Sequence, residues 1–365
     1  MVLAIGCIVC FVTTMYDQNN LKYKIPKPLK EVIGSIASCI YESEFCQYSS
    51  ADITTAIVTS AIQNKSQNGI AKSPDSDTVF WRIYNGLTFD RLEHLSKTQK
   101  PPKGTHIKVL IDGHDVMFYG KDALGLVGTK PKEGSSAAFK YLVAFSNTCP
   151  KGVVAIKELF DGSVTEDAME IIKELHRDYT VDGAIMDGEF YKAELVEYLL
   201  KAKIHFIIRR ANTGNIRDLD IKYSEPYLYK KNVERDGDKA IQLRYWIYRY
   251  HGIDGDFYLI SDVKKKPEEV RREFKSRWNI ETGFREVNRV RIKTTTRDFL
   301  VRLFFYIVSC IIYNLWQKIR FRFSLFVIRL DEVLDSIKKF MNELVLKPAD
   351  ILGLRRPRYI RLRIG

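Results

Sequence analysis

The chain is short of acidic residues, and this deficit is its most informative absence. Its 365 residues include 45 Asp and Glu against 58 Lys and Arg, which gives a net charge of +13 at neutral pH. An excess of this size favours a polyanionic partner, either nucleic acid or an anionic membrane surface. Hydrophobic residues still make up 45% of the chain, so one large core plus a smaller domain can form.

Cysteine is scarce as well. The six cysteines are scattered, and although Cys7 and Cys10 form a C-x-x-C pair, no second pair or histidine cluster completes a zinc site. A disulfide framework is not expected in a chain of this size. We therefore expect a protein of a reducing compartment, the cytoplasm.

Apolar runs long enough to span a bilayer are also missing. The two longest, "MVLAIGCIVCFVTTM" at the start and "LFFYIVSCIIYNLWQ" at residues 303–317, are shorter than the roughly 20 residues of a spanning helix. We predict that the second run is a buried core helix and that no membrane is involved. A membrane-surface protein that uses both runs remains the alternative.

The sequence divides into four stretches. Residues 1–26 are an apolar leader of undetermined role. Residues 27–99 predict three or four short helices, which form either a DNA-binding unit or a plain packing or dimerisation unit. The polar, proline-containing segment 97–104 separates them from residues 105–320, which carry the α/β pattern. Residues 321–365 predict a helical region that ends in a basic tail.

The order of elements after residue 105 predicts a mixed α/β fold. Three strands of antiparallel type are followed by helix, strand, helix and strand. Residues 211–262 predict a β-rich insertion, with "RDGDK" as a hairpin turn. The strand "RYWIYRY" within it either packs one face and exposes the other, or grips nucleic acid with its aromatic and basic side chains. Pro267 then begins the long helix that contains Glu281.

Three carboxylates stand out against this basic background. Asp112 ends the first predicted strand, Asp187 ends the strand after the first helix, and Glu281 lies in the later helix. Each aspartate alone could cap a turn, and Glu281 could simply pair with Arg277 or Arg285, four residues away on either side. Strand ends gather at one sheet edge, however, and three convergent carboxylates can hold two divalent metals about 4 Å apart. We predict a site for two Mg²⁺ ions, which prefer oxygen ligands.

Two neighbours compete with Asp112. Asp115 is the rival for the first carboxylate position, but Asp112 is preferred because it directly follows the apolar run "VLI", whereas Asp115 is expected in the following turn. His114 lies between them, and a loop histidine is more often neither a ligand nor a DNA contact.

The segment from Phe274 to Asn288 resembles the signature of the insertion-sequence-four group of DDE transposases. That signature is Tyr, two residues, Arg, three residues, Glu, six residues and Lys. Here Phe274 stands at the Tyr position, Arg277 and Glu281 match, and Asn288 stands at the Lys position. "VLIDGHDVMFYG" and "IMDGEFY" are similar to the family's two aspartate blocks. The resemblance extends over roughly residues 70–320.

The resemblance implies an RNase H-like catalytic domain that cleaves transposon ends and joins the freed 3′-hydroxyl to target DNA. Asp112, Asp187 and Glu281 would be the catalytic residues and the ligands of two Mg²⁺ ions, with Mn²⁺ as a substitute. Residues of the helical segment would contact DNA: Phe274, Arg277, Arg285, Asn288 and Arg289. The partners would be double-stranded transposon ends and target DNA, bound by a homodimer in the nucleoid.

One departure from the family affects DNA contact. Asn288 lacks the positive charge of the family's Lys, and we expect Arg289 rather than Arg285 to supply it. Two other functions remain open. One is an RNase H-like nuclease or resolvase without strand transfer, and the other is a non-catalytic, transposase-derived DNA-binding protein.

Overall fold

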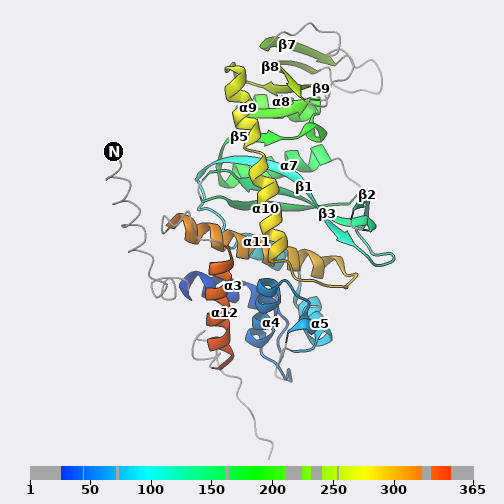
Figure 1. The fold of residues 1–365 in the computed structure, drawn as a ribbon, viewed down its shortest axis with the longest axis vertical. Helices are drawn as coiled ribbons and strands as arrows, with labels where there is room; N and C mark the ends of the chain where they lie inside the picture. The colour runs from blue at the N-terminus through cyan, green and yellow to red at the C-terminus, as the bar shows by residue number, and fades with distance from the viewer. Residues whose placement is uncertain are drawn as a thin grey trace, which may run out of the picture. The chain divides into compact units, whose positions relative to one another are not determined.

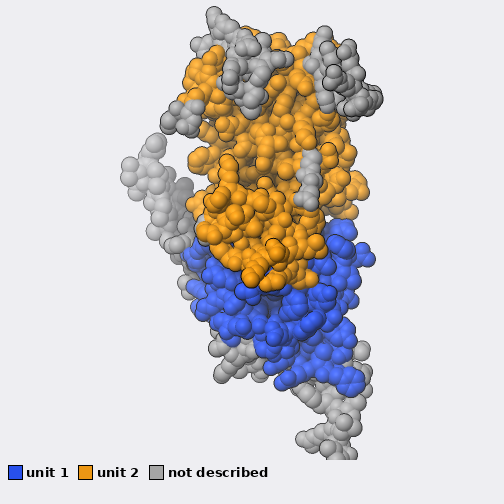
Figure 2. All heavy atoms as spheres, turned by 90° about the vertical axis from the view of Figure 1, so that its right-hand side faces the viewer, with its two compact units in different colours: residues 1–99, 287–296, 300–365 blue, residues 100–286, 297–299 orange. Residues whose placement is uncertain are grey.

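The computed structural model describes ten segments: residues 26–43, 45–70, 74–132, 134–148, 150–160, 164–210, 224–231, 241–252, 255–322 and 330–346. The predicted apolar leader, the C-x-x-C pair, the "RDGDK" turn and the basic tail lie outside them. The chain forms two compact units, coloured separately in Figure 2. The helical unit is drawn from Met1–Gln99, Val287–Thr296 and Leu300–Gly365, and the sheet unit from Lys100–Glu286 and Arg297–Phe299.

The described part of the helical unit combines segments from both ends of the chain. Its helices are α3 (Pro26–Ala37), α4 (Ser50–Gln63), η1 (Gln67–Gly69), α5 (Ser76–Gly86), α6 (Phe89–Ser96), most of α11 (Phe299–Arg322), and α12 (Leu330–Leu346). Helix α3 packs against α4 and α6, and α12 packs against α4. The region after residue 321 therefore contributes α12 to the same unit as residues 26–99.

Helix α11 contains the second apolar run, and the prediction that this run is a buried core helix is confirmed. The expectation that the run is too short to span a bilayer is wrong, because α11 is, among the described helices, the one that is long and apolar enough to do so. However, 89% of that stretch is buried inside the structure. The buried hydroxyl of Ser309 donates a hydrogen bond to the Phe305 carbonyl one turn earlier in the same helix. Buried Gln317 donates to the Tyr313 hydroxyl in the same way.

The sheet unit contains a nine-stranded mixed sheet. Its strands are β1 (His106–Phe118), β2 (Val127–Lys132), β3 (Ser135–Ser146), β4 (Gly152–Leu159), β5 (Thr180–Met186), β6 (His205–Arg210), β7 (Ser224–Lys231), β8 (Ile241–Gly252) and β9 (Gly255–Ser261). The order is β2-β3-β1-β5-β6-β9-β8-β7, and β4 also pairs with β3. Strands β1, β5 and β6 are parallel, and the other pairs are antiparallel. The predicted RNase H-like sheet with a β-rich insertion is confirmed.

Strand β1 is longer than the sequence pattern predicts. Asp112 was expected to end it, with Asp115 in a turn and His114 in a loop, but pairing with β3 continues to Phe118 opposite Ala137. All three residues are therefore inside the strand. Asp112 and Asp115 are three positions apart, so their side chains point to opposite faces of the sheet.

Different helices cover the two faces of the sheet (Figure 1). On one face, α7 (Val164–Asp178) and α8 (Ala193–Lys201) pack on a continuous apolar core that includes Ile107, Val109 and Ile111 of β1. On the other face run α9 (Pro267–Lys275) and α10 (Trp278–Arg289), one after the other. The prediction of one long helix from Pro267 through Glu281 is therefore wrong, because the helix is interrupted at Ser276 and Arg277. Alternation along β1 directs Lys108, Asp112 and His114 to that second face.

The aromatic strand β8 is half-solvated only at its start, where Gln242 and Arg244 are exposed between buried residues. From Ile247 to Tyr250 it carries buried side chains on both faces, which differs from the predicted half-solvated strand. Tyr245 and Ile247 belong to the core beneath α8. On the other side, Tyr248 donates to the Val263 carbonyl and Tyr250 donates to the Pro267 carbonyl. These tyrosines attach the insertion to the segment that leads into α9, and their burial leaves their rings little surface on which a base could stack.

Candidate active site

Three carboxylates from three separate elements converge on the guanidinium of Arg277. Nη1 lies 2.9 Å from Oδ2 of Asp112 in β1. Nη2 lies 2.9 Å from Oε1 of Glu281, one turn further along α10, and 3.9 Å from Oδ2 of Asp187, which directly follows β5. The acids that the sequence singled out are thus brought to one point, and Asp115 is elsewhere: its Oδ2 accepts a hydrogen bond from Thr129.

The two aspartates are held in the same way. Parallel pairing puts Ile111 opposite Met186, so the next residues, Asp112 and Asp187, come side by side at neighbouring strands. Oδ1 of Asp112 accepts the N–H of Gly113 at 2.9 Å, and Oδ1 of Asp187 accepts the N–H of Gly188 at 2.7 Å. Each carboxylate is therefore held through Oδ1 by the N–H of the glycine that follows it, and its Oδ2 faces the Arg277 guanidinium.

Negative charge exceeds positive charge at this point. Three carboxylates share one guanidinium, and Asp112 is largely buried, with 18% of its side chain exposed. Burial raises the pKa of Asp112 to about 6, while the Arg277 charge and the Gly113 N–H act to lower it and the carboxylates of Glu189 and Asp187 add to the rise. The site has capacity for more positive charge than Arg277 brings.

An open hollow of about 410 Å³ adjoins the acids and is lined by Asp187, Gly188, Glu189 and Arg209. Sequence reasoning missed both Glu189 and Arg209. The signal for them was present, because Glu189 follows Asp187 by two residues and Arg209 lies near the end of the next parallel strand, β6. The Arg209 side chain is exposed beside the hollow, and its guanidinium lies 5.7 Å from the centroid of the Phe257 ring.

Helix α10 can carry Glu281 to the acids because it approaches the sheet closely. Gly283 faces the Phe145 ring of β3 so tightly that a Cβ at this position would overlap it. Beside it, the Phe284 ring stacks on His114 with centroids 4.3 Å apart. His114 is therefore a buried packing residue of β1 and not the loop residue that the sequence predicted.

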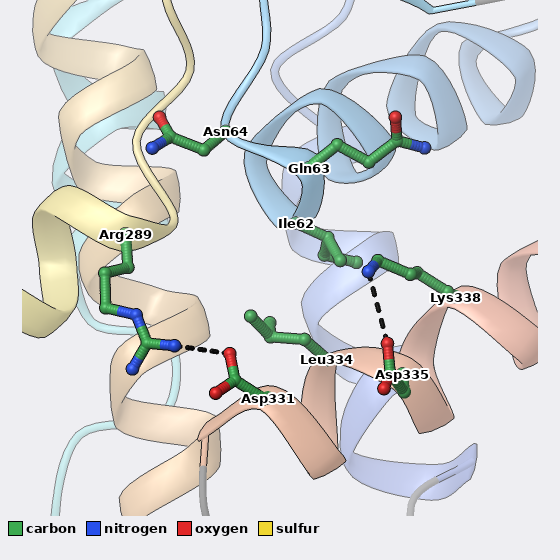
Figure 3. A pocket seen from close by; sticks show the side chains of 8 residues that line it. All are labelled: Ile62, Gln63, Asn64, Arg289, Asp331, Leu334, Asp335 and Lys338. Carbon is green, nitrogen blue, oxygen red and sulfur yellow. Dashed lines mark hydrogen bonds and ion pairs between the residues drawn. The ribbon is translucent and has the colours of Figure 1, made fainter.

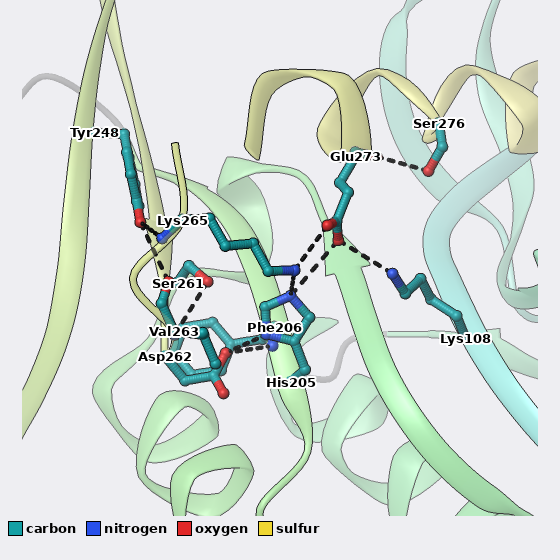
Figure 4. Close-up of polar contacts among 10 residues, drawn as sticks. All are labelled: Lys108, His205, Phe206, Tyr248, Ser261, Asp262, Val263, Lys265, Glu273 and Ser276. Atoms are coloured by element: carbon teal, nitrogen blue, oxygen red, sulfur yellow. Dashed lines mark hydrogen bonds and ion pairs between the residues drawn. The ribbon is translucent and has the colours of Figure 1, made fainter. Parts of the chain in front are cut away.

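Helix α9 is anchored to the sheet by a polar cluster around Glu273 (Figure 4). Lys265 reaches Oε1 of Glu273 at 2.7 Å, and Lys108 of β1 reaches Oε2 at 3.1 Å. His205 of β6 lies 3.6 Å from the same carboxylate through Nε2 and contacts Asp262 through Nδ1. Although burial acts to raise it, the hydrogen bonds from the two lysines lower the pKa of Glu273 to about 2.

The five predicted DNA-contacting residues fall into two groups. Phe274, Arg277 and Arg285 belong to the sheet unit, where the Arg277 guanidinium lies 5.9 Å from the Phe274 ring and Arg285 is exposed. Asn288 and Arg289 belong to the helical unit, in which Arg289 pairs with Asp331 of α12 (Figure 3). This pair competes with the phosphate contact predicted for Arg289.

The acids fit a divalent metal by their chemistry. Within the described part of the chain, no three His, Cys, Asp or Glu side chains are grouped closely enough to hold a metal as they stand. The reason is visible in the geometry, since the acids are spread around a guanidinium. They are nevertheless all oxygen donors, they face one cation, and they exceed it in charge, which is the donor set that Mg²⁺ prefers.

Comparisons with known proteins show the family of the chain and a structure of similar fold. A family model described as the transposase DDE domain matches residues 106–315. A cryo-EM structure of a piggyBac transposase synaptic complex with hairpin DNA has a similar fold, with a TM-score of 0.59 and 13% sequence identity over 95% of this chain and 83% of that chain. No curated protein sequence matches the chain.

Proposed function

The chain belongs to the family of the transposase DDE domain, and from this premise we propose that it cuts transposon-end DNA and joins the freed end to a target strand. We place it in the insertion-sequence-four group because Arg277 and Glu281 keep that group's spacing. The observation that carries the proposal is the convergence of Asp112, Asp187 and Glu281 on a single cation.

The proposed reaction consists of two exchanges at phosphorus. In the first, a water oxygen attacks a phosphorus at the transposon end, the bond to O3′ breaks, and a 3′-hydroxyl and a 5′-phosphate result. In the second, that 3′-hydroxyl attacks a phosphorus of the target strand and releases a target 3′-hydroxyl. Each step forms one P–O bond and breaks another, so no oxidant or nucleotide is consumed.

The residues of the site have distinct tasks in this proposal. Asp112, Asp187 and Glu281 would hold two Mg²⁺ ions, with Mn²⁺ as a substitute, and such ions supply activation of water and stabilisation of the leaving oxygen. Arg209, exposed at the rim of the hollow, is a phosphate-binding residue. Glu189 adds negative charge next to Asp112, and this charge makes the binding of cations at the site more favourable.

The proposed partner is double-stranded DNA, both transposon ends and target. The net charge of +13 supports this choice, and so does the similar piggyBac transposase, whose structure contains hairpin DNA. We propose that the protein acts as a homodimer on DNA in the cytoplasm, associated with the nucleoid and not with a membrane.

Cleavage of a duplex that carries the inverted repeats flanking the gene tests the proposal. With Mg²⁺, the protein should release a 3′-hydroxyl end and then produce joined target strands. Asp112→Asn, Asp187→Asn and Glu281→Gln should each abolish both products and leave duplex binding intact, because each removes a ligand charge without altering the basic surface. Asp115→Asn is the matched control and should remain active.

The alternatives give different results in the same assay. A cut end without a joined product identifies a nuclease or resolvase that lacks strand transfer. Duplex binding without any cut, by the unaltered protein and in either metal, identifies a non-catalytic DNA-binding protein. Near-normal cleavage by any one of the three acid variants shows that its residue is wrongly assigned.

A further inference from the structure

Arg277 occupies the inner face of the carboxylate cluster. Only 14% of its side chain is exposed, and its two terminal nitrogens contact all three acids. Its Nε is buried and has no hydrogen-bond partner among the described residues. The two terminal nitrogens of the guanidinium therefore contact the acids, whereas its Nε makes no hydrogen bond to the described residues.

A guanidinium and a divalent ion in this cluster need the same oxygens. Oδ2 of Asp112 and Oε1 of Glu281, both 2.9 Å from Arg277, are the atoms that these residues would offer to a metal. A unit charge held about 4 Å from a dication repels it by several kcal/mol even at an effective dielectric constant near 20. Both cations cannot occupy the cluster in this arrangement.

We propose that Arg277 and divalent metal ions are alternative occupants of the carboxylate cluster. The guanidinium keeps the three acids assembled in the metal-free protein and leaves them when metal binds. The inference rests on the proposed function, because it assumes that the three acids bind metal. It adds a role for Arg277 that metal binding alone does not require.

The surroundings of Arg277 offer a place for the displaced charge. Its guanidinium already lies 5.9 Å from the Phe274 ring, whose face can support a cation. A DNA phosphate bound beside the site would accept the released guanidinium through a bidentate contact. DNA and metal should therefore bind cooperatively, and the coupling should act equally in both directions.

Mn²⁺ titration of the full chain by isothermal titration calorimetry tests the exchange without any cleavage readout. Without DNA, Arg277→Gln should bind Mn²⁺ on the order of tenfold more tightly than the unaltered protein, since one competing charge is gone. Without metal, the Arg277→Gln protein should melt at a lower temperature than the unaltered protein. Addition of Mn²⁺ should raise the melting temperature of the variant more than that of the unaltered protein. Arg272→Gln, which removes an exposed charge from α9, should bind Mn²⁺ like the unaltered protein.

Addition of duplex DNA provides a second readout. DNA should tighten Mn²⁺ binding in the unaltered protein and in Arg272→Gln, but much less in Arg277→Gln, where no guanidinium remains to be drawn away. Arg277→Lys keeps one charge but cannot span three carboxylates, so it should also bind Mn²⁺ more tightly than the unaltered protein. This variant keeps the test decisive if the glutamine variant does not fold.

Two results would overturn the exchange. If the Arg277 variants bind Mn²⁺ no more tightly than the unaltered protein, while Asp112→Asn abolishes binding, the exchange is wrong and the proposed metal site stands. If neither the unaltered protein nor any Arg277 variant binds Mn²⁺, the metal site and the exchange fall together.

Discussion

At the scale of single residues, Gly283 controls how closely α10 approaches the sheet. Its Cα faces the Phe145 ring with no room for a side chain, and Glu281 is two residues away on the same helix. Gly283→Ala should lower stability by about 1–3 kcal/mol, because overpacking forces the helix or the ring to move. It should also reduce cleavage through displacement of Glu281. Thermal unfolding and the end-cleavage assay measure the two effects.

Gly34→Ala is the matched control for this prediction. Gly34 is exposed in α3, and a Cβ there meets nothing within 4 Å, so the change should stabilise the protein by about 0.5–1 kcal/mol. Adding Phe145→Leu to Gly283→Ala should recover part of the loss by making room. If Gly283→Ala alone melts like the unaltered protein, the close approach of α10 has been misjudged.

Sequence reasoning at this scale identified the acids but not their surroundings. Asp112 could be found because it follows an apolar run, Asp187 because it ends a strand, and Glu281 because it keeps a signature spacing. Glu189 and Arg209 were missed although their positions near strand ends were a signal, since a charge at a strand end is common and only the parallel pairing of β5 with β6 brings these two to one hollow. The pairing of Arg289 with Asp331 depends on the packing of α12, which no local pattern encodes.

At the scale of elements, the stability that the Glu273 contacts between α9 and the sheet contribute should depend on pH. The folded-state pKa of Glu273 lies near 2, below its ordinary value of 4.5. A carboxylate with a depressed pKa stabilises the fold above pH 4.5 and loses that contribution as the pH falls from 4.5 toward 2. Glu273→Gln should therefore lower stability at pH 7 and flatten the decline in melting temperature over this window.

The charged groups around Glu273 define the controls for this prediction. Lys265, Lys108 and His205 face the carboxylate, and Asp262 contacts the far side of His205. Lys265→Met should weaken the same pH dependence, whereas Glu174→Gln, an exposed change on α7, should leave it unaltered. A Glu273→Gln protein whose melting temperature declines from pH 4.5 to pH 2 as steeply as before would contradict the anchoring role.

The order of elements was predictable, but their lengths were not. The alternation of strands and helices from residue 105 predicted the mixed sheet, because apolar periodicity is a local property of the sequence. The extension of β1 past Asp112 comes from pairing with β3, which continues to Phe118 and is a tertiary effect. The burial of Tyr248 and Tyr250 in β8 has the same origin, since the segment leading into α9 covers a face that was predicted to be solvated.

At the scale of the whole molecule, the positive charge should set the salt dependence of DNA binding. The chain carries a net charge of +13, and binding should weaken steeply as salt rises because neutralised phosphates release counterions. Deletion of residues 355–365 removes five arginines: Arg355, Arg356, Arg358, Arg361 and Arg363. For each phosphate that the shortened chain no longer neutralises, the slope of log affinity against log salt should become shallower by about 0.9. A fluorescence anisotropy titration that gives the same slope would show that the tail does not touch DNA.

The central claim is that three carboxylates, distant in sequence, form one metal site. The most direct measurement is the anomalous difference density of Mn²⁺ in crystals of the protein bound to transposon-end DNA. We predict density in contact with Asp112, Asp187 and Glu281, with the Arg277 guanidinium withdrawn from them. Density at Asp115, or an ordered DNA complex with Arg277 still on the acids and no manganese there, would contradict this claim.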